Sequence, residues 1–215
     1  MKLSKARSLD YVSKKISLFE VPEFMYFKVE SFQKDLATIS KKIQSKFIKG
    51  LIVVRSSAAN EDGAAYSAAG EYDSVLDVRA NNLSEIKSAI KVVLLSYKNK
   101  GENYNDEIIV QRMISDVSMS GVIFTYELNT GAPYYVINYD DVSGLTDTVT
   151  SGNGEYANRT LYVHRDSINS IKSERFKKLL LAVKELEDVF QDRYLDIEFA
   201  LDNEFNAKLF QVRKI

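Results

Sequence analysis

Several residue types and patterns that would support particular functions are missing from this chain. It has no cysteine, which excludes disulfides, thiolate catalysis and metal sites built from cysteine. No apolar run approaches the roughly 20 residues that a membrane-spanning helix needs, and no apolar targeting core follows Met1. Neither sign of charge dominates, because 29 lysines and arginines stand against 30 aspartates and glutamates. No overall field would therefore attract nucleic acid or an anionic membrane, and we expect a cytoplasmic protein with local charged sites.

The remaining composition is that of a globular protein. With 215 residues and 45% hydrophobic content, the chain can bury a core in one large domain or two small lobes. Apolar residues recur at helical spacing in the segments 32–47, 83–98 and 176–190, and Asn82 with Glu85 forms a capping pair ahead of the second. Strand-like runs occupy 51–54, 107–111, 121–125, 134–138 and 161–164. Helices beside mainly antiparallel strands predict an α+β fold.

Two strand-like runs joined by a polar turn end the chain. The first alternates apolar residues with Asp196 and Glu198, as a half-buried strand requires. If the turn is centred between residues 204 and 205, Glu198 lies opposite Gln211 and Asp196 opposite Arg213. Four polar side chains would then share one face of the hairpin.

This polar face has two interpretations. A carboxylate beside an amide oxygen suits a hard cation such as Mg²⁺, so Glu198 and Gln211 are candidate metal ligands. Arg213 would hold the neighbouring Asp196 ionised and oriented. An ordinary amphipathic hairpin, with a solvated face and a cross-strand ion pair, would produce the same alternation. The pattern alone leaves both interpretations open.

A second group of residues follows the strand-like run 51–54. Arg55 ends the run, and Ser56 opens a segment rich in serine, alanine and glycine that reaches Gly70. Arginine offers a rigid fork of donors for phosphate oxygens, and small residues let backbone amides approach a polyanion. The spacings of a Walker loop or a dinucleotide fingerprint are absent. The segment is chemically similar to a phosphate cradle, and a flexible loop with Arg55 in a surface ion pair is the alternative.

Taken in order, segments from both ends of the chain resemble one family. The most specific are Val54-Arg55-Ser56-Ser57-Ala58 with Glu61-Asp62, Ser67-Ala68-Ala69-Gly70, Val110-Gln111-Arg112-Met113-Ile114, Gly121-Val122-Ile123-Phe124-Thr125, Asp196-Ile197-Glu198 and Leu209-Phe210-Gln211-Val212-Arg213. They are similar to motifs of the ATP-binding domain of phosphoenolpyruvate synthase and pyruvate phosphate dikinase, a branch of the ATP-grasp superfamily. Lys5-Ala6-Arg7-Ser8-Leu9 and Val21-Pro22-Glu23-Phe24 resemble the family's first two motifs.

The resemblance implies a two-lobed ATP-grasp-like fold, with residues 1–106 as the N-terminal lobe and 107–215 as the C-terminal lobe. It implies that Lys5 and Arg55 contact ATP phosphates, that the segment from Gln111 lines the adenine, and that Glu198 and Gln211 hold Mg²⁺. The residues assigned to nucleotide contacts or catalysis are Lys5, Arg55, Ser56, Gln111, Met113, Asp147, Asp196 and Arg213.

Two departures qualify the implied activity. The single histidine, His164, does not lie in a motif resembling the family's phosphohistidine site, and Asp147 stands where the family has glutamate. The resemblance therefore implies an ATP-dependent phosphotransferase that transfers the β-phosphoryl group to a histidine on another domain, in the same longer chain or in a separate subunit. The alternatives are a nucleotide-binding module without catalysis and an ATP-grasp ligase.

Overall fold

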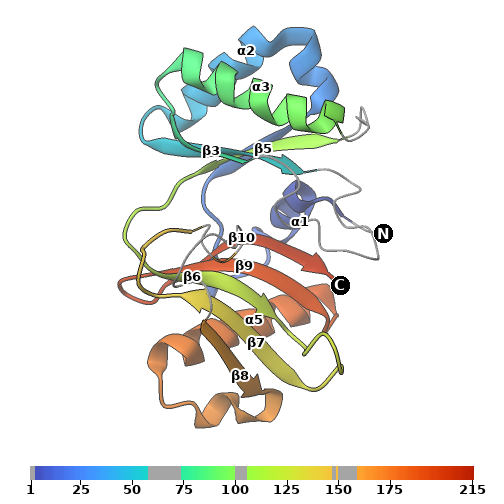
Figure 1. The fold of residues 1–215 in the computed structure, drawn as a ribbon, viewed down its shortest axis with the longest axis vertical. Helices are drawn as coiled ribbons and strands as arrows, with labels where there is room; N and C mark the ends of the chain where they lie inside the picture. Colours follow the sequence, from blue (N-terminus) through green and yellow to red (C-terminus); the bar gives the residue numbers. More distant parts are fainter. Residues whose placement is uncertain (1–2, 58–73, 100–105, 147–148, 150–158) are drawn as a thin grey trace. The chain divides into compact units, whose positions relative to one another are not determined.

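A computed structural model describes residues 3–57, 74–99, 106–146, 149 and 159–215 (Figure 1). The chain divides into two compact units. The first comprises Leu3–Ala6 and Pro22–Ile114, and the second comprises Arg7–Val21 and Ser115–Ile215. The helix α1, Lys5–Val12, contributes residues to both units.

The first unit is an antiparallel sheet with two helices on one face (Figure 1). Its elements are β2 (Phe24–Lys28), α2 (Val29–Phe47), β3 (Leu51–Ser57), β4 (Ser74–Arg79), α3 (Leu83–Asn99) and β5 (Glu107–Arg112). The strand order is β2-β5-β3-β4. Buried apolar residues of both helices form one core with Ile52 and Val54 of β3 and with Ile108 and Val110 of β5. The opposite face of the sheet therefore carries the alternate residues of these strands.

Local side-chain hydrogen bonds cap the start of α3 and the second segment of α2. The Asn82 side chain accepts hydrogen bonds from the backbone N–H groups of Ser84 (3.1 Å) and Glu85 (3.3 Å), and Glu85 accepts one from the Asn82 amide (2.9 Å). The predicted capping pair of α3 is thus confirmed. In α2 the backbone leaves helical values at Asp35, whose carboxylate caps the continuing helix by accepting from Thr38 N (2.9 Å).

The second unit is a six-stranded sheet with the order β1-β10-β9-β6-β7-β8. Only the pairing of β1 with β10 is parallel among the described strands. Its elements after α1 are β1 (Phe19–Glu20), β6 (Val117–Phe124), β7 (Tyr134–Asp140), β8 (Arg159–His164), the 3₁₀ helix η1 (Arg165–Ser170), α5 (Glu174–Phe190), β9 (Leu195–Asp202) and β10 (Ala207–Lys214). The last helix and the terminal hairpin follow one another directly, as the sequence predicts.

A buried polar cluster joins α5 to the sheet. Glu187 of α5 accepts hydrogen bonds from the Tyr135 hydroxyl (2.9 Å) and from Arg165 Nη2 (2.7 Å). Arg165 also donates to the Thr125 carbonyl (2.8 Å) and stacks on the Tyr135 ring, 4.6 Å from its centroid. Burial, together with the Glu187 charge, raises the pKa of the Tyr135 phenol, so the hydroxyl stays a donor at neutral pH.

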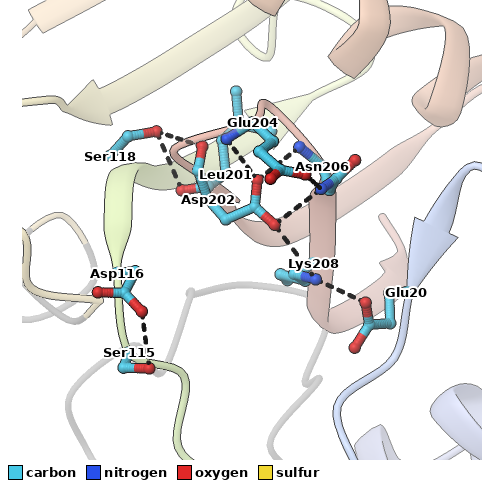
Figure 2. A network of polar contacts seen from close by, with 9 residues as sticks. All are labelled: Glu20, Ser115, Asp116, Ser118, Leu201, Asp202, Glu204, Asn206 and Lys208. Carbon is cyan, nitrogen blue, oxygen red and sulfur yellow. Dashed lines mark hydrogen bonds and ion pairs between the residues drawn. The ribbon is translucent and has the colours of Figure 1, made fainter.

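Asp202 organises the turn between β9 and β10 (Figure 2). Its carboxylate accepts hydrogen bonds from the backbone N–H groups of Glu204 and Asn206, both at 2.9 Å. Burial alone would raise the pKa of Asp202, but the hydrogen bonds from Asn206 and Glu204 lower it. Lys208 Nζ lies 3.5 Å from Asp202 Oδ2 and 2.5 Å from Glu20 Oε2, which fastens β1 to the hairpin. A carboxylate of depressed pKa stabilises this arrangement at neutral pH and loses that contribution as the pH falls.

The α+β class, the mainly antiparallel sheets and the flanking helices are confirmed. The division into compact units differs from the predicted boundary after residue 106. Because β5 pairs with both β2 and β3, the first unit continues to Ile114. Residues 7–21 belong to the second unit, where β1 pairs with β10. Among the described residues, no helix has the length and apolarity to cross a membrane.

Gly121 of β6 allows the close approach of β7. A Cβ atom at this position would lie 2.0 Å from the Asn138 carbonyl oxygen and 2.9 Å from Tyr139 Cα. Gly121→Ala must therefore separate paired backbones, and we expect it to lower the free energy of unfolding by about 3 kcal/mol. Urea denaturation of both proteins measures the difference.

Gly131→Ala is the matched control. Gly131 has φ +69°, but a Cβ there would meet no atom within 4 Å, so we expect a loss of only about 1 kcal/mol from the left-handed backbone. Equal losses in the two variants would contradict the assigned cause at Gly121.

Candidate functional site

The terminal hairpin has the predicted register at its polar end. Glu198 pairs with Gln211, and Asp196 pairs with Arg213. A bulge between Leu209 and Gln211 separates this register from the one nearer the turn, which is offset by one residue. The extra residue, Phe210, keeps Gln211 and Arg213 on the face that carries the two carboxylates.

Asp196 and Arg213 form a buried ion pair on this face. Asp196 Oδ2 accepts from Arg213 Nε and Nη2, both at 2.6 Å. The Asp196 side chain is 5% exposed and the Arg213 side chain 17%. The pair is thus not the solvated cross-strand pair of an ordinary amphipathic hairpin. Arg213 fixes the orientation of the carboxylate beside Glu198.

Gln211 brings a buried amide to the same face. The residue is 2% exposed, and its Oε1 atom has no hydrogen-bond partner among the residues that the structure describes. Leaving a buried acceptor unpaired costs free energy, and a bound cation would satisfy it. Glu198 lies directly opposite, so the donor set of one carboxylate and one amide oxygen fits Mg²⁺. In the described part of the chain, no cluster of three or more His, Cys, Asp or Glu side chains could hold a metal, so the cation would need oxygens from a ligand or from water.

Two predicted nucleotide contacts of the first unit, Arg55 and Gln111, share the sheet face opposite to α2 and α3. In the β3–β5 pairing, Val53 lies opposite Gln111, Arg55 opposite Ile109 and Ser57 opposite Glu107. Gln111 is 1% exposed, and its Nε2 atom has no hydrogen-bond partner among the described residues. A buried amide donor is therefore present on the face that carries Arg55.

Lys5 is held near the end of β3 by its neighbours in the chain. Ser4 Oγ donates to Glu107 Oε2 (2.6 Å), and the Ala6 backbone N–H donates to Ser57 Oγ (3.0 Å). These bonds place the first turn of α1 beside the strand that carries Arg55. Two predicted phosphate contacts thus meet at one end of the first unit's sheet.

Glu107 and Tyr97 support this arrangement, and the sequence analysis did not single them out. The Tyr97 hydroxyl donates to the Glu107 carbonyl (2.6 Å) and accepts from the Ser57 N–H (2.7 Å). Both residues are almost fully buried. In the sequence, the one signal for a special role of Glu107 is that a charged residue begins an apolar strand. Tyr97 carries no such signal, because its position in the helix is that of an ordinary core residue.

Other predicted residues are not gathered in the same way. Ser56 pairs with Ile108, so its side chain lies on the helix-covered face, opposite to Arg55. Met113 follows β5, and its sulfur accepts from the Asp77 N–H (3.1 Å). Asp147 and the segment 58–70 lie outside the described residues.

His164 lies at the end of β8, where it contacts a neighbouring aromatic ring and caps the following 3₁₀ helix. Its ring packs edge-on against Tyr134, with 5.2 Å between centroids, and its Nδ1 atom accepts from the Asp166 N–H (3.3 Å) to cap η1.

Removing Arg213 would leave the Asp196 carboxylate buried without its cation. We expect Arg213→Met to lower the free energy of unfolding by about 3 kcal/mol at neutral pH. Arg159→Met is the control, because Arg159 is half exposed in its ion pair with Asp141 and that carboxylate keeps a second ion pair with Arg175, so the loss should be small. Chemical denaturation compares the two. A loss at Arg213 no larger than at Arg159 would contradict the buried-pair interpretation.

Comparisons with known proteins complete the description of the site. The family described as pyruvate phosphate dikinase, AMP/ATP-binding domain, matches residues 12–166. This match includes Arg55 and Gln111 but stops before the terminal hairpin. The prodigiosin synthesizing transferase PigC of Serratia marcescens is 31% identical over 109 residues, which is 47% of this chain and 12% of that protein.

Solved structures extend the likeness over the whole chain. D-alanyl-alanine synthetase A of Vibrio cholerae superposes with a TM-score of 0.51 at 18% identity, covering 97% of this chain and 53% of that one. PH1788 of Pyrococcus horikoshii gives 0.60 at 14% identity, covering 99% and 90%. The dinucleotide-forming acetyl-coenzyme A synthetase 1 of Ca. Korarchaeum cryptofilum, in complex with coenzyme A and Ca-AMPCP, gives 0.58 at 11%, covering 100% and 93%.

The chain thus spans a small part of the curated relative and about half of the first of these structures. At such identities the structures establish a shared fold and nothing further, whereas the family match extends over most of the sequence. The chain belongs to the AMP/ATP-binding domain family of pyruvate phosphate dikinase.

Proposed function

We propose that this chain binds Mg-ATP and transfers a phosphoryl group from it to a histidine on a separate domain. The observation that carries the proposal is the buried, unpartnered Oε1 of Gln211 opposite Glu198. An unsatisfied buried oxygen is destabilising, so a ligand that pairs with this acceptor would offset that cost. A magnesium ion shared with the triphosphate would satisfy it.

The first unit supplies a second, independent argument. Gln111 belongs to the segment proposed to line the adenine, and its buried Nε2 is also unpartnered among the described residues. A nucleotide base offers ring-nitrogen acceptors that such a donor can bind. Each unit thus contains one proposed ligand, Gln111 or Gln211, with a buried amide atom that has no hydrogen-bond partner among the described residues.

Each proposed ligand has a distinct task. Lys5 and Arg55 bind phosphate oxygens, and Arg213 holds the Asp196 carboxylate in position beside the metal ligands Glu198 and Gln211. When bound, Mg²⁺ neutralises charge on the phosphates. Because phosphoryl transfer depends chiefly on positioning and electrostatic stabilisation, these residues require no covalent participation. Ser56, Met113 and Asp147 remain proposed nucleotide contacts, with Ser56 acting through its backbone.

The proposed acceptor is a histidine of another domain, since His164 caps a helix. In the proposed transfer an imidazole nitrogen bonds to the β-phosphorus and loses its proton, and the bond between that phosphorus and the oxygen retained by AMP breaks, so the β- and γ-phosphoryl groups move together. Water then cleaves the linkage between these two groups, which releases inorganic phosphate and leaves the β-phosphoryl group on the histidine. A cytoplasmic location stays a prediction of the sequence.

Calorimetric titration with a nonhydrolysable ATP analogue tests the binding part. We expect the wild-type chain to bind the analogue more tightly with Mg²⁺ than without it. Glu198→Ala removes a metal ligand, so it should lower the affinity about tenfold or more in Mg²⁺ and much less in its absence. Mg²⁺ alone should not bind measurably, because the residues that the structure describes offer too few ligands.

Glu204→Ala is the control for this titration, since Glu204 is exposed in the turn of the same hairpin. It should bind like the wild type under both conditions. Equal loss of affinity by Glu198→Ala with and without Mg²⁺ would mean that Glu198 is structural, and a folded wild-type chain that binds no nucleotide would refute the proposal.

The chemical part is tested with ATP labelled at the β- or the γ-phosphorus, in the presence of a histidine-containing partner domain. We expect acid-labile protein phosphate to carry the β-label only, with AMP as the nucleotide product. ADP without AMP, together with an acyl phosphate, would favour a ligase. Nucleotide binding without any turnover would favour a non-catalytic module.

A further inference from the structure

We propose that Arg112 is a positioning residue that sets the affinity for the base of the nucleotide. It lies between Gln111 and Met113, which are proposed to line the adenine, and nothing above gives it a role in binding. The inference rests on the proposed function and deepens it. It separates the part of the affinity that depends on the base from the part that depends on the phosphates.

The backbone around Arg112 is held from both sides. Its own N–H donates to the Glu23 carbonyl (2.8 Å), which continues the β2–β5 pairing beyond the last strand residue. The next N–H, of Met113, donates to the Leu51 carbonyl (3.0 Å) at the start of β3. The short segment 111–113, at the C-terminal end of β5, is therefore held by backbone hydrogen bonds to the segments that begin β2 and β3.

The Arg112 guanidinium reinforces this attachment through side-chain contacts. Nη2 donates to Glu23 Oε2 (2.7 Å), and Nε donates to the same oxygen at 3.2 Å. Nη1 donates to the Lys49 carbonyl (2.9 Å), and Nη2 also reaches the Phe47 carbonyl (3.2 Å). A cation is favoured here because these carbonyls lie at the C-terminal end of α2. One side chain thus joins the start of β2, the end of α2 and the end of β5.

Arg112 does not itself face the proposed ligand. Successive side chains of a strand point to opposite faces, and Arg112 shares its parity with Ile108 and Val110, which pack in the helix-covered core. Gln111 points to the other face with Arg55. Arg112 can consequently influence a nucleotide only by fixing the backbone from which Gln111 and Met113 extend.

The contacts of Arg112 are too exposed to be important for global stability. Its side chain is 35% exposed and that of Glu23 is 41% exposed, and exposed ion pairs add little to folding. Variants at this position should therefore fold, while the geometry of the segment changes. Lysine is the informative replacement, because it keeps the charge but cannot reproduce the planar fork of donors.

Titration of Arg112→Lys with Mg-ATP analogue and, separately, with inorganic tripolyphosphate and Mg²⁺ tests the inference. We expect about fivefold weaker binding of the nucleotide and unchanged binding of tripolyphosphate, because the phosphate contacts do not involve residues 111–113. A purely structural role would weaken both ligands together. Arg79→Lys is the matched control, since Arg79 forms an exposed ion pair with Glu85 in the same unit and should leave both affinities unchanged.

A second variant, Glu23→Gln, tests the same inference in case Arg112→Lys does not fold. Glu23→Gln removes the carboxylate that holds the guanidinium but leaves the carbonyl contacts, so it should produce a smaller loss in the same direction. Unchanged nucleotide binding in both variants, or equal loss of nucleotide and tripolyphosphate, would overturn the role of Arg112 while leaving the proposed function intact. Failure of the wild-type chain to bind nucleotide would overturn both.

Discussion

The pairing of β9 with β10 is the constraint on which the candidate metal site depends. Successive strand residues face opposite sides, so a shift of one residue would exchange the polar and apolar faces of β10. The bulge at Phe210 introduces that shift between the turn and the polar end of the hairpin. Without it, Phe210 would lie opposite Glu198, and Gln211 would point toward the apolar face. The extra residue is therefore a condition for placing an amide and a carboxylate together.

The two units position the polar residues of the candidate site by different interactions. In the second unit, the Asp196–Arg213 pair is buried beside Glu198 and Gln211. Burying an ion pair does not by itself favour folding, so its retention is best understood as fixing the geometry of its neighbours. In the first unit, hydrogen bonds from Ser4 and Ala6 hold the segment that carries Lys5. There, the position of Lys5 is determined by hydrogen bonds of its neighbours to residues that are distant in sequence.

Much of the architecture could be predicted because local signals and the fold agree. Asn82 and Glu85 cap α3 as their spacing indicates, and the apolar period of α2 continues across its interruption at Asp35. The strands β2 and β4 were not predicted. Residues of β2 are mostly half-buried without alternation, and β4 contains Asp77 at φ +56°, so neither has the regular period of a half-buried strand.

The sequence by itself determined the residue types at the candidate site and the α+β class, because these depend on composition and short-range alternation, which a linear pattern records. The pairing of Glu198 with Gln211 was predicted from a turn centred between residues 204 and 205, but near the turn the register is offset by one residue, and the bulge at Phe210 restores the predicted pairing. Tertiary structure alone decided that both Gln111 and Gln211 are buried with unpartnered amide atoms, that Ser56 faces the helices, and that Glu107 and Arg112 anchor neighbouring segments. Burial and hydrogen-bond satisfaction depend on which distant segments pack together, and contacts between residues 4 and 107 or 23 and 112 leave no periodic trace in the chain.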